Sequence, residues 1–197
     1  MRNILDIFSD KKILIYGLGK TGISTFNFLK KKCKVFLFDD IKKNLRLSKY
    51  KFILKSNFDY IIISPGIDIN NCKLSKFLKK NSSKIYSDLD IFYSFYKNDC
   101  ITITGTNGKS TVCQILYEVL RKHKRDVKLV GNIGNPILSV KKIKPKTIFV
   151  IEASSYQLEY SKIFKSKYGV ILNITPDHIE RHKTINKYVK AKFKLLK

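Results

Sequence analysis

The chain has 197 residues, 44% of them hydrophobic, which is enough for one or two domains with proper apolar cores. No apolar run approaches the ~18 residues of a membrane-spanning helix, and the N-terminus lacks the long apolar core of a signal peptide. We therefore expect a cytoplasmic protein without membrane insertion, and the four scattered cysteines fit a reducing compartment.

The formal net charge of +25 raises the hypothesis of a basic nucleic-acid-binding module. Only five of the 40 basic residues are arginine, the residue that reads bases and phosphates in a bidentate manner. The lysines are also spread along the whole chain. We therefore expect no specific nucleic-acid partner, only weak binding to polyanions.

The first segment has the pattern of a βαβ nucleotide-binding unit. A buried strand over 11–16 runs into a G-x-G-x-x-G turn at 17–22, and a helix is expected over about 23–31. A second strand over 35–38 ends at Asp39, where a Rossmann unit places its ribose-binding acid. The glycines do not decide which nucleotide binds, so a nicotinamide-dependent dehydrogenase stays an alternative.

A third strand over 59–63 ends in Ser64-Pro65-Gly66. Ligands of open α/β sheets bind at such strand ends, although a purely structural turn is the alternative. Ser87 is expected to cap a helix with acids in its first turn. The polar stretch 96–99 then predicts a domain boundary, which gives domains 1–97 and 98–197.

The second segment opens with a predicted phosphate loop. A β-branched strand over 101–104 precedes the sequence Gly105-Thr106-Asn107-Gly108-Lys109-Ser110-Thr111, which leads into a helix. Backbone N–H groups at the helix start face an anion, Lys109 reaches the outer phosphates, and a hydroxyl is available to Mg²⁺. An ordinary turn is the alternative. The helix is expected to bury one face, made of Val112, Ile115, Leu116, Val119 and Leu120.

Two later strand ends carry further polar residues. The loop 131–136, with Asn132, is expected to approach a ligand, and the buried strand 147–151 ends at Glu152. A carboxylate and the Ser110 hydroxyl suit Mg²⁺, although Glu152 could instead cap a helix. After a strand over 170–173, two histidines, two acids and an arginine cluster at 177–182, including His178.

The last helix has a lysine in its predicted apolar stripe. Lys192 shares a face with Ile185, Tyr188, Val189 and Leu196. Burial favours the neutral amine, which is nucleophilic and can react with carbon dioxide to give a carbamate. A lysine stem that lies along the apolar surface with its charge in water is the alternative.

In order and spacing, these motifs resemble the Mur ligases of peptidoglycan synthesis over nearly the whole chain. The resemblance rests on 17–24, 64–66, 103–111, 131–134, 152–159, 172–178 and 188–192. The fold class it implies is α/β: a Rossmann-like UDP-binding domain followed by a P-loop-type, mostly parallel ATPase domain. The short phosphate loop is the family's own form.

The resemblance also implies roles for individual residues. Lys109, Glu152, His178 and Lys192 would be catalytic, and residues 105–111 would bind ATP. One Mg²⁺ would bind Ser110 and Glu152, and a second would lie near His178 and carbamoylated Lys192. The substrate would contact Lys20, Thr21, Asp39, Ser64, Pro65, Gly66, Asn132 and Ser154.

The implied reaction adds D-glutamate to UDP-N-acetylmuramoyl-L-alanine through an acyl phosphate, with the protein as a monomer. A sibling Mur ligase or a folylpolyglutamate synthase-like ligase is the alternative, although the latter lacks a separate UDP-binding first domain. A dehydrogenase would leave the phosphate loop and Lys192 without a purpose. Family members carry a third, Rossmann-like domain, and this sequence stops at Lys197. We therefore expect a truncated or split protein that binds substrate weakly and ligates little or nothing.

Overall fold

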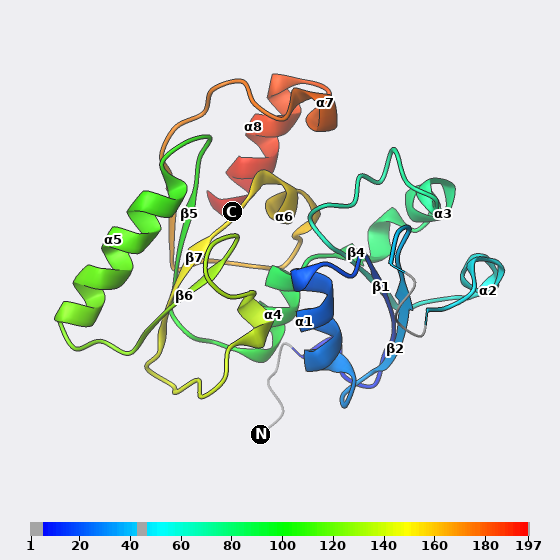
Figure 1. Ribbon diagram of the computed structural model, residues 1–197, viewed down its shortest axis with the longest axis horizontal. Coiled ribbons are helices and arrows are strands. Elements are labelled where there is room, and N and C mark those ends of the chain that lie inside the picture. The colour runs from blue at the N-terminus through cyan, green and yellow to red at the C-terminus, as the bar shows by residue number, and fades with distance from the viewer. Residues whose placement is uncertain (1–5, 43–46, 197) are drawn as a thin grey trace.

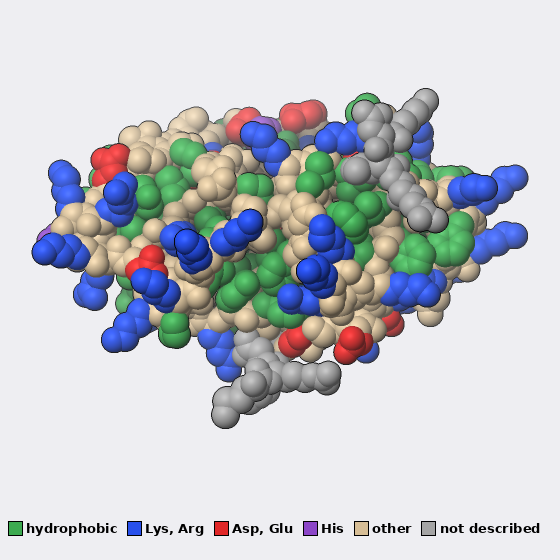
Figure 2. Space-filling model, turned by 60° about the horizontal axis from the view of Figure 1, so that its bottom comes forward, with side chains coloured by type: hydrophobic (Ala, Val, Ile, Leu, Met, Phe, Trp, Pro, Cys, Tyr) green, Lys and Arg blue, Asp and Glu red, His purple; other side chains and the backbone are tan. Residues whose placement is uncertain are grey.

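The computed structural model describes residues 6–42 and 47–196. Most of the N-terminal stretch, for which the sequence predicts no signal peptide, lies outside these residues. Within the described part, no helix is both long and apolar enough to cross a membrane. On the face that Figure 2 shows, lysine and arginine side chains are dispersed among apolar and neutral ones rather than gathered in one patch.

Two four-stranded sheets, all of whose strand pairs are parallel, form the framework (Figure 1). The first has the order β2 (Lys34–Phe38), β1 (Lys12–Tyr16), β3 (Tyr60–Ile63), β4 (Ile85–Tyr86). Its helices are α1 (Lys20–Leu29), α2 (Tyr50–Lys55), α3 (Ser75–Lys80) and α4 (Asp88–Phe95), with a short 3-10 turn, η1 (Ser82–Lys84).

The second sheet has the order β6 (Val127–Gly131), β7 (Ile148–Glu152), β5 (Cys100–Thr104), β8 (Tyr168–Ile171). Its helices are α5 (Lys109–Lys122), α6 (Ser155–Tyr160), α7 (Ile179–His182) and α8 (Ile185–Phe193), with 3-10 turns η2 (Ile137–Ser139) and η3 (Lys194–Leu196). The predicted mostly parallel α/β fold is confirmed.

One apolar core joins the two sheets. It runs from Ile13 and Ile62 of the first sheet through Phe92 of α4 to Phe149 and Ile151 of the second. The rings of Phe92 and Phe149 are 4.7 Å apart at their centroids. The predicted boundary at residue 97 therefore falls between two sheets that share a core, and it stays a prediction.

Two buried carboxylates at the start of α4 also connect the halves. Asp90 is fully buried, and its Oδ1 accepts bonds from the Ser161 hydroxyl and from three consecutive backbone N–H groups, at Lys162, Ile163 and Phe164, over 2.8–3.0 Å. Its Oδ2 accepts from the N–H of Ser87, which completes the predicted helix cap. Asp90 thereby holds the turn after α6 against α4.

The predicted buried faces of α5 and α8 are partly wrong. On α5, Ile115 and Val119 are 57% and 45% exposed, and the fully buried residue is Cys113. On α8, which ends at Phe193, Ile185 and Leu196 are exposed, whereas Tyr188 and Lys192 are buried as expected, together with Ala191 and Leu195. The buried face of α8 includes Ala191, which the prediction from large apolar residues did not include.

The exposure of Ile115 and Val119 on α5 follows from the position of β8 at the edge of the second sheet. Val170 pairs with Ile103, whose side chain packs against α5, so Tyr168 and Val170 lie on the α5 face of the sheet. Both are exposed, at 57% and 38%. Among the described residues, α5 covers β5, β6 and β7, and the flank of α5 toward β8 stays open.

Replacing Asp90 should destabilise the protein strongly. In Asp90→Asn an amide NH₂ takes the place of one acceptor oxygen, so buried N–H donors lose their partner, at a cost of about 2–4 kcal/mol. Urea unfolding measures the loss. Asp99→Asn is the control, because Asp99 is half exposed and pairs with Lys167 on the surface, and it should change stability by less than about 0.5 kcal/mol. Equal effects of the two substitutions would contradict this assignment.

Asp88 should make stability fall as the pH rises from about 4 to about 6. Burial raises the pKa of Asp88 to about 6, although a bond from Gln157 opposes the shift. The native state therefore holds a proton that the unfolded state releases, and on the order of 3 kcal/mol is lost across this window. Asp88→Asn should flatten the dependence in urea unfolding at pH 4, 5, 6 and 7. An unchanged pH profile would exclude Asp88 as its source.

Candidate active site

The predicted phosphate loop lies between β5 and α5. Gly108 caps the helix with φ +81°, a left-handed conformation that favours glycine. The N–H groups of the first turn of a helix have no partner within the helix, so those of α5 are available to an anion beside the positive end of the helix dipole. The local geometry is that of an anion cradle.

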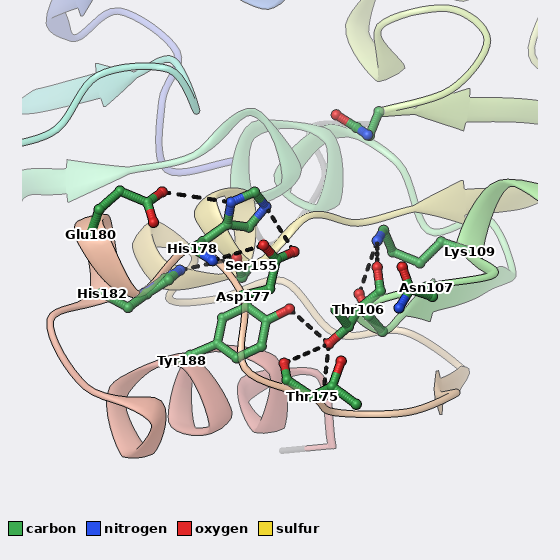
Figure 3. Close-up of polar contacts among 12 residues, drawn as sticks. Thr106, Asn107, Lys109, Ser155, Thr175, Asp177, His178, Glu180, His182 and Tyr188 are labelled. Atoms are coloured by element: carbon green, nitrogen blue, oxygen red, sulfur yellow. Dashed lines mark hydrogen bonds and ion pairs between the residues drawn. The ribbon is translucent and has the colours of Figure 1, made fainter.

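Asn173 clamps this loop from the end of β8. Its Oδ1 accepts bonds from the N–H groups of Thr106 and Asn107 at 3.1 and 3.0 Å, and its Nδ2 donates to the Asn107 carbonyl at 3.1 Å. Thr106 also contacts the Tyr188 hydroxyl at 3.0 Å and the Thr175 backbone, as Figure 3 shows. The loop is thus held in shape from outside its own sequence.

Glu152 lies at the carboxyl end of β7, is 1% exposed and accepts two neutral donors. The Ser110 hydroxyl donates to Oε2 at 2.7 Å, and the Asn132 amide donates to Oε1 at 2.7 Å. Three elements, the first turn of α5, the β6 end and the β7 end, therefore meet at one carboxylate. A carboxylate and a hydroxyl beside a phosphate cradle form a donor set that fits Mg²⁺.

Two lysines converge on one carbonyl of the loop. Lys109 donates to the carbonyls of Gly105 and Thr106 at 2.9 and 2.7 Å, and Lys192 donates to the same Gly105 carbonyl at 2.7 Å. Lys192 is 1% exposed, with its amine 4.5 Å from the centre of the Tyr188 ring. Burial, followed by the nearby Lys109 charge, lowers the pKa of Lys192 to about 8. Its amine therefore lies inside the protein and not in water.

His178 lies directly before α7. Its Nε2 is 3.4 Å from Asp177 and its Nδ1 is 3.8 Å from Glu180, and the side chain is 44% exposed (Figure 3). Within the described residues, no group of three or more His, Cys, Asp or Glu side chains could hold a metal ion. As an ammonium, Lys192 cannot be a metal ligand either, so the second predicted metal site depends on a modification of that amine.

All candidate substrate residues except Ser154 line a cleft of about 450 Å³ at the carboxyl ends of the first sheet. Asn132, from the second sheet, lines the same cleft. Ser154 does not: its hydroxyl accepts a bond from the Gln157 N–H at 3.3 Å and caps α6. The predicted residues in the lining are Lys20, Thr21, Asp39, Ser64, Pro65 and Gly66.

Two of these residues already hold the cleft together. The Ser64 hydroxyl donates to the Gly17 carbonyl at 2.6 Å, and Asp39 accepts the Leu18 N–H at 2.6 Å. Burial acts to raise the pKa of Asp39, but backbone N–H bonds, with that of Lys42 the strongest, outweigh it and lower the pKa. At Gly22 a Cβ would come within 1.9 Å of the Gly17 carbonyl, so only glycine fits there.

Three residues with structural influence on the site received no role from the sequence. Asn173 and Tyr188 hold the phosphate loop, and Arg181 donates to the carbonyls of Pro65 and Ile67. A signal existed for Asn173, because it follows β8 at the same sheet edge as the loop. None existed for the partners of Arg181, which lie 114–116 residues away in sequence.

Known proteins resemble this chain both in sequence and in fold. Residues 103–197 match the Mur ligase middle domain family. A solved structure of UDP-N-acetylmuramate:L-alanyl-gamma-D-glutamyl-meso-diaminopimelate ligase from Neisseria meningitides has a similar fold, with a TM-score of 0.56 and 16% identity over 95% of this chain and 68% of that one. Residues 103–197 therefore belong to the Mur ligase middle domain family.

Similar curated proteins carry the name UDP-N-acetylmuramoylalanine--D-glutamate ligase. The protein from Rickettsia felis is 38% identical over 94% of this chain, and that from Clostridioides difficile is 36% identical over 92%. The chain spans 43% and 44% of the length of these two relatives.

Removing the Asn173 clamp should weaken nucleotide binding selectively. Asn173→Ala frees the loop N–H groups and lets the cradle change shape, so the Kd for Mg·ATP should rise about tenfold, as for the loss of about 1.4 kcal/mol. Isothermal titration calorimetry measures it. Asn98→Ala is the matched control, because Asn98 donates to the backbone carbonyls of Lys144, Pro145 and Thr147. An equal loss of Mg·ATP affinity in both variants would mean that Asn173 acts only through general stability.

Proposed function

We propose that this chain supplies the UDP-substrate and ATP sites of an ATP-dependent ligase that joins D-glutamate to UDP-N-acetylmuramoyl-L-alanine. One observation carries the proposal: Asn132 lines the first-sheet cleft and bonds Glu152, and Glu152 bonds Ser110 of the phosphate loop. A substrate in that cleft would therefore reach the position where a nucleotide γ-phosphate is held. We assign 1–97 to the UDP substrate and 98–197 to ATP.

The chemistry needs a carboxylate brought to a phosphate. In the proposed reaction the alanine carboxylate oxygen attacks the γ-phosphorus, the bond to ADP breaks, and an acyl phosphate forms. The D-glutamate amine then forms an N–C bond to the acyl carbon and gives up a proton, while the C–O bond to phosphate breaks and inorganic phosphate leaves. Both early reactants are anions, so charge neutralisation is the main task of the protein.

The residues divide this task. The first-turn N–H groups of α5 hold the phosphates, and Lys109, now bonded to loop carbonyls, turns to the transferred phosphate. Ser110 and Glu152 would hold a Mg²⁺, which would supply neutralising charge. Asn132 orients the carboxylate of the substrate while its amide stays bonded to Glu152. Thr106, Asn107, Gly108 and Thr111 complete the ATP loop.

Lys192 is the proposed site of a carbamate. At a pKa of about 8, about one tenth of the amine is neutral at pH 7, compared with about 0.03% for an ordinary lysine. Reaction with carbon dioxide forms an N–C bond and releases the amine proton. The carbamate replaces a cation beside Lys109 with an anion, and together with His178 it would provide oxygen and nitrogen ligands for a second Mg²⁺. We further propose a cytoplasmic monomer.

Binding of two ligands tests the function. Calorimetry should detect both Mg·ATP and UDP-N-acetylmuramoyl-L-alanine, and Glu152→Gln should raise the Kd for Mg·ATP by at least tenfold because the metal loses its carboxylate. Glu118→Gln is the control, since Glu118 lies exposed on α5 and bonds Gln114. Failure to bind either ligand, or tighter binding of NADH or a folate, would refute the proposal. Phosphate release that depends on D-glutamate would show whether the chain also ligates.

The carbamate can be detected directly. With ¹³C-labelled bicarbonate, a carbamate carbon signal should appear in the NMR spectrum of the protein and be missing from Lys192→Arg. Lys190→Arg on the exposed side of α8 should leave it unchanged. A signal that survives Lys192→Arg would contradict the assignment.

A further inference from the structure

Arg181 of α7 lies behind the candidate substrate loop, outside the cleft lining. Its side chain is only 9% exposed. Nη1 donates to the Pro65 carbonyl at 3.2 Å, and Nη2 donates to the Ile67 carbonyl at 2.6 Å. These bonds connect the second sheet's α7 to the loop 64–68, which lines the first-sheet cleft.

The same guanidinium is fixed from the α6 side. Nη2 also donates to the Tyr160 hydroxyl at 3.0 Å, and the guanidinium carbon lies 4.5 Å from the centre of the Tyr156 ring. Two carboxylates, Asp68 and Glu159, approach it at 3.9 and 3.8 Å. The cation is thus held by both halves of the protein, and a flat fork with several donors is required to make these contacts together.

The neighbouring residue anchors α7 from its other side. His182 is buried, and its Nε2 lies 3.0 Å from the Ser155 hydroxyl at the start of α6 (Figure 3). Burial lowers the pKa of His182 and so favours the neutral ring. Residues 181 and 182 therefore tie a four-residue helix to the loop 64–68 and to α6, and this helix begins directly after His178.

We propose that Arg181 is a positioning residue that fixes the loop 64–68 in its binding conformation and couples occupancy of the cleft to the position of α7. The proposal rests on the proposed function for the identity of the ligand. Coupling is reciprocal, so an anionic UDP-muramoyl ligand in the cleft orders α7, and an ordered α7 favours that ligand. A lysine at this position keeps the charge but cannot make the forked contacts.

Three readouts on one pair of variants test this. Arg181→Lys should raise amide hydrogen exchange at Gly66, Ile67 and Asp68 at least tenfold, with core amides of β1 and β5 within twofold of wild type. Its Kd for UDP-N-acetylmuramoyl-L-alanine should rise at least fivefold, and its Kd for Mg·ATP should stay within twofold. Arg121→Lys is the matched control, because Arg121 of α5 lies exposed over the Tyr117 ring.

The coupling has its own readout. In wild type, the UDP-muramoyl ligand should slow exchange at 179–183, and in Arg181→Lys this protection should be lost. If Arg181→Lys does not fold, Tyr160→Phe removes a hydroxyl that accepts from the guanidinium and itself donates to the Ile67 carbonyl at 3.5 Å, and it should still raise loop exchange at least threefold.

Unchanged loop exchange in Arg181→Lys would overturn the proposal. So would a rise that is equal throughout the core, or an equal loss of affinity for both ligands, because either indicates general destabilisation. If the wild type does not bind the UDP ligand, the proposed function fails, and the exchange of the unliganded protein still decides whether Arg181 positions the loop.

Discussion

The buried carboxylate of Glu152 is the contact on which the site depends. It is 1% exposed, and its described bonds come from an amide and a hydroxyl, neither of which carries a charge. A buried anion is costly unless it is hydrogen-bonded, and the positive end of α5 adds to its stabilisation. Ser110, Asn132 and Glu152 meet only because β5, β6 and β7 are parallel and end at the same edge of the sheet.

Positive charge accumulates around the neighbouring loop. Lys109 and Lys192 donate to one carbonyl oxygen, that of Gly105, so two ammonium groups, one partly buried and one buried, lie close together. Burial and this repulsion together lower the pKa of Lys192. Phosphate oxygens, or a change of Lys192 from cation to anion, would relieve it. A site with this charge favours an anionic ligand.

The first-sheet cleft and the phosphate loop keep their relation through contacts that cross between the sheets. Phe92 packs on Phe149, Asp90 holds the turn after α6, and Asn132 reaches the cleft from β6. The shared apolar core makes the two sheets one packed unit rather than two bodies joined by a linker. Such a fixed spacing would serve the proposed transfer of a phosphoryl group from nucleotide to substrate.

The sequence alone determined the local geometry. Strand, glycine turn and helix start predicted the phosphate loop, the end of a buried strand predicted Glu152, and helical spacing predicted the burial of Lys192, because each depends on residues close together in the chain. The structure alone decided the long-range partners: Asn173 on the loop, Arg181 on the Pro65 carbonyl, and Ser154 as a helix cap. The structure also decided which side of α5 is covered. Helical periodicity predicts which residues share the apolar face of a helix, but it does not predict how far the sheet extends beneath that face.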